Sequence, residues 1–537
     1  MELCDQYIHE YILLNPTIND ILKIDKYKHL RNKYPNFMSK EYEKKENKLN
    51  KKYYTILQKK KKKTFDDVLF YEDLKEYFKV YDFPDEYFPL SYLDNYFNDM
   101  ITDINSPETQ YNFSDVQSYK DFISRLKKIK PICNAMIQNM KRGIQKKMTI
   151  PTIIVHGIIQ QLQDIIENNN KTNNFNHYRK IPNSIQKEFI HTIDSCLISC
   201  IRKLIQFLID DYIDNSRKTI GLYDLKDGKK LYKEIIKSYT FKNYTPDDIY
   251  KYGIREIQRN KKELIKLQKK MKIKGDYQYF MNSIKNNKSS KINKKTIIID
   301  ELKKIKKRIQ KEIFETYFDD SLTKKDDYKI KCVSKENEHM IAYYLLPDFK
   351  NERKGTFFIN PSNVDKYELT VLSIHEGIPG HHYENIIHQR KTNISLYTRL
   401  NNYTSYSEGW ALYCESLFEP KNNYELFWKL IYNLHRSVRL VIDTGIHYYK
   451  WSYEKSFQYM KRYLPFSDNM IKNEIYRYIC DPGQAITYKI GELTMFELRD
   501  IFFKKFPNDY KEFHKLILKI GPCPLNILKE EFIKRIN

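Results

Sequence analysis

The sequence predicts a mainly α-helical protein with a small β element, and three observations lead to this prediction. Apolar residues recur at spacings of three and four over long segments, as from Ile153 to Ile165, which is typical of amphipathic helices. Prolines are sparse, 18 in 537 residues, and no glycine- or serine-rich linker divides the chain. Only residues 341–364 have the character of β-strands.

Two lysine-rich tracts lie within the predicted helical part of the chain. One is the unbroken run Lys59–Lys63, and the other, residues 258–310, mixes lysine with isoleucine and leucine at helical spacing. Such tracts can bind phosphates or a membrane surface, but the solvated faces of helices in a lysine-rich protein have the same composition. We favour solvated helix faces.

The charge balance of the whole chain is strongly basic. Lysine and arginine number 94 against 69 aspartates and glutamates, so the formal net charge is +25. The excess is mostly lysine and accompanies 46 tyrosines, a bias that A/T-rich codons produce whatever the function. We therefore expect no specific nucleic-acid partner, and keep binding of a polyanion as an alternative.

The chain start and the cysteines lead us to expect a cytoplasmic protein. The first residues, MELCDQYIHEYILL, carry acids early and lack a basic segment followed by a cleavage site. No stretch of about 18 apolar residues occurs, so we expect no membrane span. The eight cysteines are scattered without a CxxC pair, as in a reduced, intracellular protein.

Residues 341–364 contain two short β-prone runs separated by a charged, turn-rich piece. We expect a small hairpin or edge strand directly before the helix that contains residue 375. A sheet edge there could accept an extended peptide as a further strand. A hairpin that only covers the helix is an equally good interpretation.

The most specific chemistry lies in two short strings, HEGIPGHHYE at 375–384 and EGWALYCE at 408–415. The first contains His375, Glu376, His381 and His382, and Glu408 follows His375 by 33 residues (408 − 375). A hydrolytic zinc site needs three protein ligands and an open position for water. A glutamate beside a ligand can then act as the general base.

The spacing of these histidines does not fit a straight helix. The usual arrangement places the second histidine four residues after the first, but that position is Pro379. On an undistorted helix His382 would lie about 10.5 Å further along the axis than His375. Pro379 and Gly380 therefore predict a break that brings His381 or His382 back beside His375.

The two strings resemble the signature of the "domain of unknown function 885" family, HExxPGHH followed by EGWALYxE. That family in turn resembles zincin-like helical zinc peptidases of the carboxypeptidase Taq type. The resemblance implies that His375, Glu408 and one of His381 or His382 bind one zinc ion, with Glu376 as the base. A glycine commonly precedes the second ligand in the related peptidases, which favours His381.

Two further segments strengthen the resemblance, HRSVRLVIDTGIHYYKW at 435–451 and PGQAITYKIG at 482–491. It is clear from about residue 250 to the end of the chain. We therefore expect a catalytic zincin-like region at 251–537 and an N-terminal helical region at 1–250 that covers the cleft. The two regions are expected to form one compact unit.

These segments supply candidate accessory residues. His447 could donate a hydrogen bond to the developing oxyanion, or could cap a buried carbonyl. Tyr488 could donate to the same oxyanion.

Four charged residues complete the predicted site. Arg436 and Arg439, one helical turn apart, could clamp the carboxylate of a substrate, or could pair with structural acids such as Asp443. Glu415, two turns after Glu408, is expected to orient a ligand histidine by contacting its ring without binding the metal itself. Asp443 is counted with Glu415 among the residues that surround the ligands.

From these residues and the resemblance, we expect a zinc-dependent hydrolase that cleaves peptide bonds in short peptides. It would be a metallopeptidase of the carboxypeptidase or dipeptidase type, with Glu376 activating a zinc-bound water. The alternatives are a catalytically inactive protein that binds a metal or a polyanion, and a zinc hydrolase of a non-peptide amide.

Overall fold

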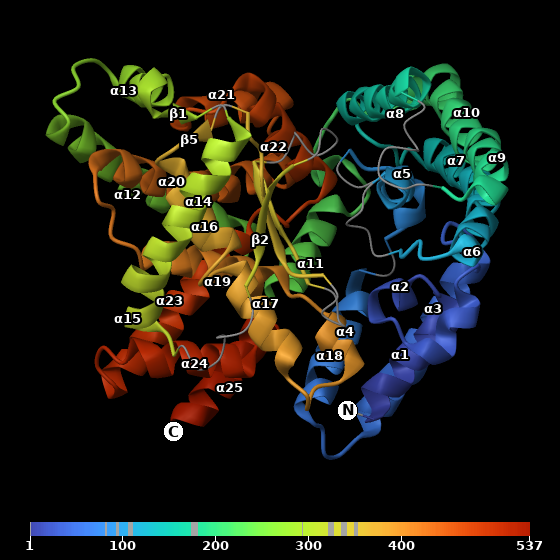
Figure 1. The fold of residues 1–537 in the computed structure, drawn as a ribbon, viewed down its shortest axis with the longest axis horizontal. Coiled ribbons are helices and arrows are strands. Elements are labelled where there is room, and N and C mark those ends of the chain that lie inside the picture. The colour runs from blue at the N-terminus through green and yellow to red at the C-terminus, as the bar shows by residue number, and fades with distance from the viewer. Residues whose placement is uncertain are drawn as a thin grey trace. The chain divides into compact units, whose positions relative to one another are not determined.

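Helices make up most of the described chain, as the sequence predicts (Figure 1). The structure, a computed structural model, describes residues 2–80, 83–92, 96–105, 111–172, 181–292, 294–319, 327–333, 341–347, 353–362 and 364–537. The chain divides into two compact units near residue 220. Unit 1 holds the residues up to Ile220 together with Asp224–Lys226 and Ser395–Tyr397, and unit 2 holds Gly221–Tyr223, Asp227–Ile394 and Thr398–Asn537.

Unit 1 is built from helices whose apolar faces form its core. They are α1 (Glu2–Leu14), α2 (Ile18–Leu22), α3 (Lys40–Lys59), α4 (Phe65–Val80), α5 (Tyr96–Asn105), α6 (Val116–Leu126), α7 (Ile129–Lys146), α8 (Thr152–Thr172), α9 (Asn183–Thr192) and α10 (Ser199–Phe207). Asp115 and Ser118 form a capping box that starts α6. Inside the unit, Arg125 donates to both carboxylate oxygens of Asp20, at 2.6 and 3.1 Å, which compensates the burial of its charge.

Unit 2 holds both motif strings, HEGIPGHHYE and EGWALYCE. Its helices are α11 (Gly228–Thr240), α12 (Pro246–Lys270), α13 (Tyr277–Lys285), α14 (Lys295–Ile309), α15 (Glu315–Tyr317), α16 (Glu368–Glu376), α17 (His381–Arg390), α19 (Thr404–Ser416), α20 (Asn423–His447), α21 (Tyr453–Tyr463), α22 (Asp468–Cys480), α23 (Thr487–Lys505), α24 (Tyr510–Ile520) and α25 (Leu525–Ile536). The short α18 (Leu396–Leu400) spans the boundary between the units. The longest helices, α12 and α20, pack against each other at Gly253, where an added Cβ would lie 2.7 Å from Val441 Cγ2.

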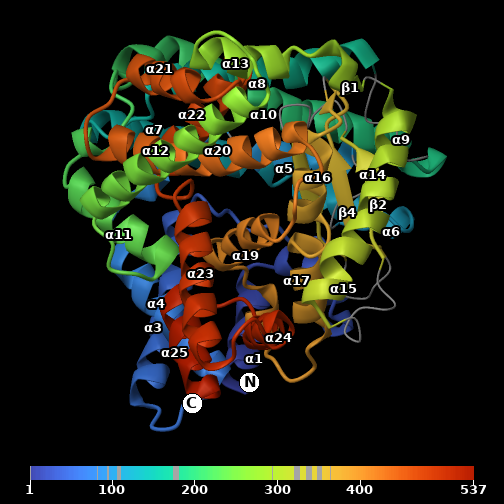
Figure 2. The same ribbon diagram turned by 90° about the vertical axis from the view of Figure 1, so that its left-hand side faces the viewer.

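Helix α19, which holds the second string, packs closely against α23 (Figure 2). Gly409 and Gly491 face each other across this contact, and a Cβ on Gly491 would lie 1.9 Å from the carbonyl oxygen of Ser405. No side chain fits between the two backbones at this point. The contact fixes α19 firmly relative to the core of unit 2.

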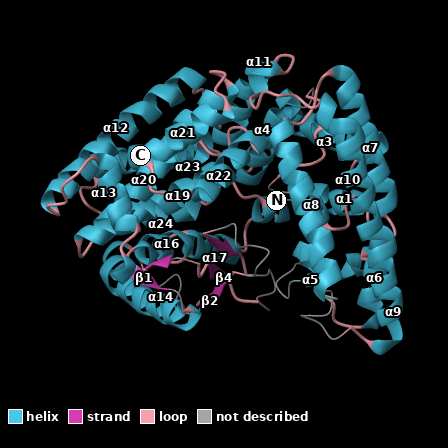
Figure 3. Ribbon diagram, turned by 90° about the horizontal axis from the view of Figure 1, so that it is seen from above, coloured by secondary structure: helices cyan, strands magenta, loops and turns pink. Residues whose placement is uncertain are grey.

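The β element lies beside α16 and α17 (Figure 3). Strands β3 (Ala342–Leu345) and β4 (Thr356–Ile359) pair antiparallel, which confirms the two predicted β-prone runs. Residues 348–352 of the expected turn lie outside the described residues. Two pairings were not predicted: β2 (Lys329–Cys332) joins β4 in parallel, and β1 (Lys291–Ile292) pairs antiparallel with β5 (Val364–Asp365).

The second lysine-rich tract forms parts of α12, α13 and α14, each with a buried apolar side. In α12, Ile257, Leu264 and Leu267 are buried, while Lys266 is exposed and pairs with Glu263. This arrangement is that of solvated helix faces. None of the helices in the described part of the chain combines the length and apolar character that a membrane span requires.

Candidate metal centre

The predicted break in the histidine helix is confirmed. Helix α16 ends at Glu376 and α17 begins at His381, with Gly377–Gly380 between them and a cis bond before Pro379. The amide of Gly380 donates to the carbonyl of Ile374 at 3.0 Å. The chain therefore turns back over the last turn of α16, and His381 comes to lie beside His375.

Two contacts hold this turn in place. A Cβ on Gly380 would lie 2.0 Å from the carbonyl oxygen of His375, so only glycine fits there. From α19, the indole Nε1–H of Trp410 donates to the carbonyl oxygen of Pro379 at 2.9 Å. Trp410 is fully buried, and from the sequence we assigned it no role in the site. A buried indole N–H normally needs a hydrogen-bond acceptor, and this need could have indicated from the sequence that Trp410 contacts a backbone carbonyl.

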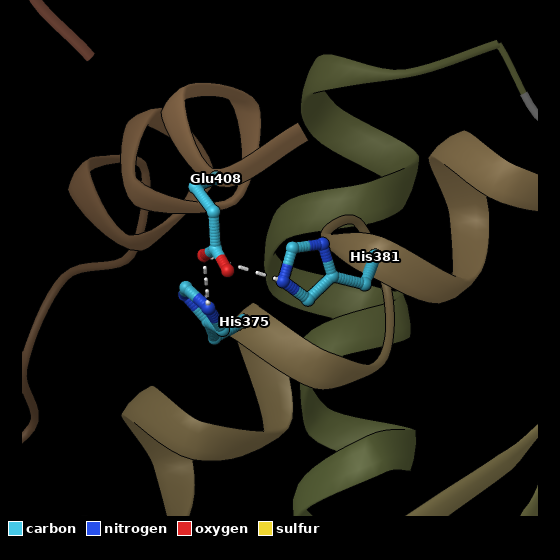
Figure 4. Close-up of side chains that lie close together, drawn as sticks. All are labelled: His375, His381 and Glu408. Carbon is cyan, nitrogen blue, oxygen red and sulfur yellow. Dashed lines mark ion pairs between the residues drawn. The ribbon is translucent and has the colours of Figure 1, made fainter. Parts of the chain in front are cut away.

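Three side chains converge at the break (Figure 4). Glu408 on α19 points its Oε2 at both imidazoles, 3.2 Å from His375 Nε2 and 3.5 Å from His381 Nε2. The three ligand atoms of this group all lie within 4.8 Å of one another. The residues come from the end of α16, the start of α17 and the first turns of α19.

The donor set and its surroundings fit a zinc ion. Two imidazole nitrogens and one carboxylate oxygen are ligands that zinc takes in hydrolytic sites, where a further position stays open. Glu408 Oε2 is buried, and its contacts with the two imidazoles do not have the geometry of a good hydrogen bond in the described structure. A buried carboxylate oxygen without a hydrogen bond is costly, and a metal ion would satisfy it.

The neighbouring His382 faces elsewhere. Its Nδ1 lies 2.8 Å from the hydroxyl of Tyr344 on β3, and its ring packs on that of Tyr328 at 4.6 Å. Among the described residues, the group that could hold a metal includes His381 and not His382. Of the two alternatives left open by the sequence, the geometry favours His381.

Glu415 lies behind His375, as expected. Its Oε1 lies 2.8 Å from His375 Nδ1, on the side of the ring away from Glu408. Burial acts to raise the pKa of Glu415, but the Arg436 guanidinium, 3.4 Å away, and the hydrogen bond with His375 lower it overall. An ionised Glu415 accepts from Nδ1–H and leaves Nε2 of His375 free to bind a metal.

The charges of the carboxylates and imidazoles determine the direction of the pKa shifts in the site. Burial acts to lower the pKa of His375, but Glu408 and Glu415 raise it to about 10. Burial acts to raise the pKa of Glu408, yet His381 and His375 hold it well below its usual range. Without a metal, the carboxylates draw protons onto the imidazoles, and a divalent cation would replace those protons.

Glu376 is the last residue of α16 and is buried beside the ligands. Its pKa is raised, mainly by burial. The His375 and His381 imidazoles oppose this effect. Its role as the base stays a prediction.

Arg436 and Arg439 contact different acids. Arg436 stacks over the ring of Tyr432 at 4.7 Å and reaches Glu415, which leaves it close to the ligands. Arg439 instead donates to Glu474 from Nε at 3.2 Å and from Nη2 at 3.0 Å. A guanidinium that already forms this two-point pair is poorly suited to clamp a substrate carboxylate.

Tyr488 belongs to the same charged cluster. Its ring lies under the Arg439 guanidinium at 4.3 Å, and its hydroxyl accepts from Arg477 Nη2 at 2.7 Å. A hydroxyl that accepts from an arginine keeps its own hydrogen available for another acceptor. Its donation to an oxyanion stays a prediction.

The contacts of His447 and Asp443 do not support their predicted places in the site. His447 Nε2 lies 2.8 Å from the carbonyl oxygen of Tyr478, and its Nδ1 accepts from the amide of Leu222 at 3.2 Å. Both ring nitrogens are engaged, which is the carbonyl-capping alternative. Asp443 instead accepts from the hydroxyl of Tyr232 and from the amide of Gly483.

Two solved structures have the same fold. One is described as the "putative lipoprotein" from Colwellia psychrerythraea, with a TM-score of 0.89 and 18% identity over 99% of this chain and 98% of that one. The other, a "putative lipoprotein of unknown function" from Shewanella oneidensis, has a TM-score of 0.75 and 15% identity over 99% of both chains. At these identities the likeness concerns the fold alone. No curated protein matches the chain.

These neighbours contradict the cytoplasmic location that we predicted from the sequence, because both are described as lipoproteins. We treat that prediction as wrong. Its grounds were the lack of a recognisable leader, the lack of a long apolar run and the scattered cysteines. Each of these is the absence of a signal, and none is a physical property that ties a protein to one compartment.

One family matches almost the whole chain. It is described as "Bacterial protein of unknown function (DUF885)", and it matches residues 22–532, which include every residue of the candidate metal centre. The match extends well upstream of residue 250, from which the resemblance in the sequence is clear. The chain therefore belongs to the DUF885 family.

Proposed function

We propose that this protein is a zinc-dependent hydrolase that cleaves peptide bonds in short peptides, as a carboxypeptidase or dipeptidase. The observation that carries the proposal is the convergence of His375 Nε2, His381 Nε2 and Glu408 Oε2. The buried Glu376 carboxyl beside them is the second requirement of such chemistry. The buried Glu408 Oε2 faces both imidazole nitrogens, which is the arrangement that a shared metal ion requires.

The chain's own residues would divide the chemistry as follows. His375, His381 and Glu408 would hold one zinc ion, which polarises a carbonyl and lowers the pKa of water at its open position. Glu376 would take a proton from the attacking water and return it to the leaving nitrogen. Glu415 would keep His375 in the orientation and tautomer that a ligand needs.

The zincin-like character of the fold is part of this proposal. It is supported by a ligand helix that ends in the His375–Glu376 pair and by a third ligand from a separate helix, α19. The neighbouring β3 offers a short strand next to α16, as a site that binds an extended peptide would require.

The test is the substitution Glu376→Gln, which keeps the size of the side chain and removes the base. We expect this variant to bind one zinc per chain and to lose hydrolysis by a factor of about 10² to 10⁴. Glu368→Gln is the matched control, because Glu368 is a half-buried carboxyl at the other end of the same helix and accepts a hydrogen bond from the Tyr432 hydroxyl. The control should remain active.

Dipeptides, longer peptides and acyl-amides should be tested in parallel with both variants. A zinc-loaded Glu376→Gln protein with full activity would refute the proposed role of Glu376. Activity on acyl-amides alone would replace the peptide substrate by a non-peptide amide. A protein without stoichiometric zinc that binds RNA with a steep salt dependence would instead be the polyanion-binding alternative.

A further inference from the structure

His381 is held on the side of its ring that faces away from Glu408. The hydroxyl oxygen of Ser407 lies 3.3 Å from His381 Nδ1 and 2.8 Å from Glu384 Oε2. Ser407 and Glu384 are both nine-tenths or more buried, at 3% and 1% exposure. Ser407 directly precedes the ligand Glu408, and Glu384 follows His381 by one turn of α17.

The directions of these hydrogen bonds fix the tautomer of His381. A serine hydroxyl has one hydrogen, and Ser407 donates it in a hydrogen bond to the carboxyl of Glu384. The Ser407 oxygen can then only accept from His381, so Nδ1 carries the hydrogen of the ring. Nε2 is then the nitrogen that a metal ion would take in place of a proton, and it is the atom that lies 3.5 Å from Glu408 Oε2.

The two ligand histidines are thus held in the same way. His375 is held at Nδ1 by Glu415 directly, at 2.8 Å, and His381 is held at Nδ1 by Glu384 through Ser407. Each contact leaves Nε2 facing Glu408. Such outer contacts of metal-binding histidines set both ring orientation and ligand basicity.

A purely structural reason for Glu384 explains less. Its carboxylate lies in the first turn of α17, where a negative charge stabilises a helix. An exposed side chain would serve that purpose, whereas Glu384 is buried and its Oε1 has no hydrogen bond in the described structure. Its Oε2 accepts hydrogen bonds from the hydroxyl of Ser407 and, at 3.5 Å, from the side-chain amide of Asn385. Burying this carboxyl costs free energy, and a role in orienting the metal ligand through Ser407 would account for it.

We propose that Ser407 and Glu384 are positioning residues of the metal centre, which hold His381 with Nε2 directed at the ion. The inference rests on the metal site of the proposed function, but not on which bond the protein hydrolyses. It assigns a role to two residues that the motif comparison left without one.

The first test is the zinc affinity of Ser407→Ala, measured by competition with a chromophoric chelator. We expect an affinity 10- to 100-fold weaker than that of the unchanged protein. The visible absorption spectrum of the cobalt-substituted protein should change as well, because the imidazole is no longer held in one orientation. Ser405→Ala is the matched control. Ser405 lies two residues earlier on α19, is fully buried, and its hydroxyl has no hydrogen bond in the described structure.

A pair of changes at Glu384 separates positioning from the effect of charge on the helix. Glu384→Ala removes the acceptor, so Ser407 can donate to Nδ1 and stabilise the wrong tautomer, and zinc affinity should fall as in Ser407→Ala. Glu384→Gln still offers an oxygen to Ser407 and should retain most of the affinity. Equal losses in both variants would indicate a charge effect and overturn the proposal.

Zinc affinity within twofold of the unchanged protein in Ser407→Ala, with the same cobalt spectrum, would also overturn it. If Ser407→Ala does not fold, the two Glu384 variants decide the question. A protein that binds zinc and depends on Ser407 for it, yet hydrolyses no peptide, would refute the proposed function and leave this inference standing. A protein that binds no zinc would refute both.

Discussion

His381 and His382 are neighbours in the chain, yet their side chains contact different parts of the protein. His381 faces Glu408 and Ser407, and His382 faces Tyr344 and Tyr328. The difference follows from the start of α17, where consecutive side chains point in directions about 100° apart. One of the two histidines can reach the metal position, and the other then turns toward the β element.

This difference can be tested by replacing each histidine with alanine. We expect His381→Ala to lose stoichiometric zinc, because one of three ligands is removed. His382→Ala should still bind one zinc per chain and serves as the control at the adjacent position. Zinc content is measured by mass spectrometry after gel filtration. The reverse result, with zinc lost only from His382→Ala, would show that the second ligand has been assigned to the wrong residue.

At this scale the sequence predicted the candidate ligands that come together in the structure better than their surroundings. The motif contains His375, Glu376 and Glu408 at positions that chemistry makes recognisable. The choice between His381 and His382 depends on how the chain leaves the break, which is set by Gly380 and by the contact of Trp410 from another helix. The partner of Arg439, Glu474, lies 35 residues away, and no spacing rule connects the two.

At the scale of elements, α19 positions most of the centre. It supplies the ligand Glu408, the contact of Ser407 with His381, the contact of Glu415 with His375 and the hydrogen bond of Trp410 to Pro379. The helix is itself held against α23 where Gly409 meets Gly491. The site geometry therefore depends on a helix contact that includes no ligand.

Gly491→Ala tests this dependence. Its new Cβ would meet the carbonyl oxygen of Ser405, a backbone atom that can move only with α19. We expect unit 2 to lose about 1–3 kcal/mol of stability from overpacking. All three tryptophans of the chain, Trp410, Trp428 and Trp451, lie in unit 2, so tryptophan fluorescence in urea reports the unfolding of this unit.

Asp500→Ala, on the exposed side of the same helix α23, is the control. It should change stability by less than about 0.5 kcal/mol. Equal midpoints for Gly491→Ala and the control would mean that the two helices can separate without cost.

The elements themselves were predictable to different degrees. Helices such as α8 and α12 show their period in the sequence, and β3 and β4 are rich in aromatic and β-branched residues. Strand β2, with the sequence KIKC, has no such signal, and its parallel pairing with β4 is a long-range contact. The break between α16 and α17 was predictable because proline and glycine restrict the backbone in known ways.

At the scale of the whole molecule, the pKa shifts of buried histidines and of buried carboxyls change the stability in opposite directions as the pH falls. Burial lowers the pKa of His388 to about 4, and those of His435 and His514 to about 3. Burial also raises the pKa of Glu368 and of Asp443 to about 7. On acidification the histidines favour the unfolded state, which takes up protons near pH 6.5, and the carboxyls favour the folded state, which takes up protons first. The individual contributions therefore show only when single groups are removed.

His514 offers a clean case, since its Nδ1 lies 2.7 Å from the carbonyl oxygen of Tyr317 and its Nε2 2.8 Å from the hydroxyl of Tyr413. Its folded pKa lies below the unfolded value, so its contribution is present above pH 6.5 and is lost as the pH falls. From pH 7 to pH 5 the unchanged protein should lose roughly 2 kcal/mol more stability than His514→Phe. Urea midpoints of tryptophan fluorescence, measured in chelator to exclude metal release, give this difference. Parallel pH profiles for the two proteins would mean that His514 is protonated in the fold or is not buried.

The central claim is that His375, His381 and Glu408 hold a zinc ion. The most direct measurement is anomalous X-ray diffraction from zinc-saturated crystals, with data on both sides of the zinc absorption edge. The account predicts a single strong peak within about 2.0–2.2 Å of His375 Nε2, His381 Nε2 and Glu408 Oε2. The absence of a peak there, or a peak bound by His382 in place of His381, would contradict it.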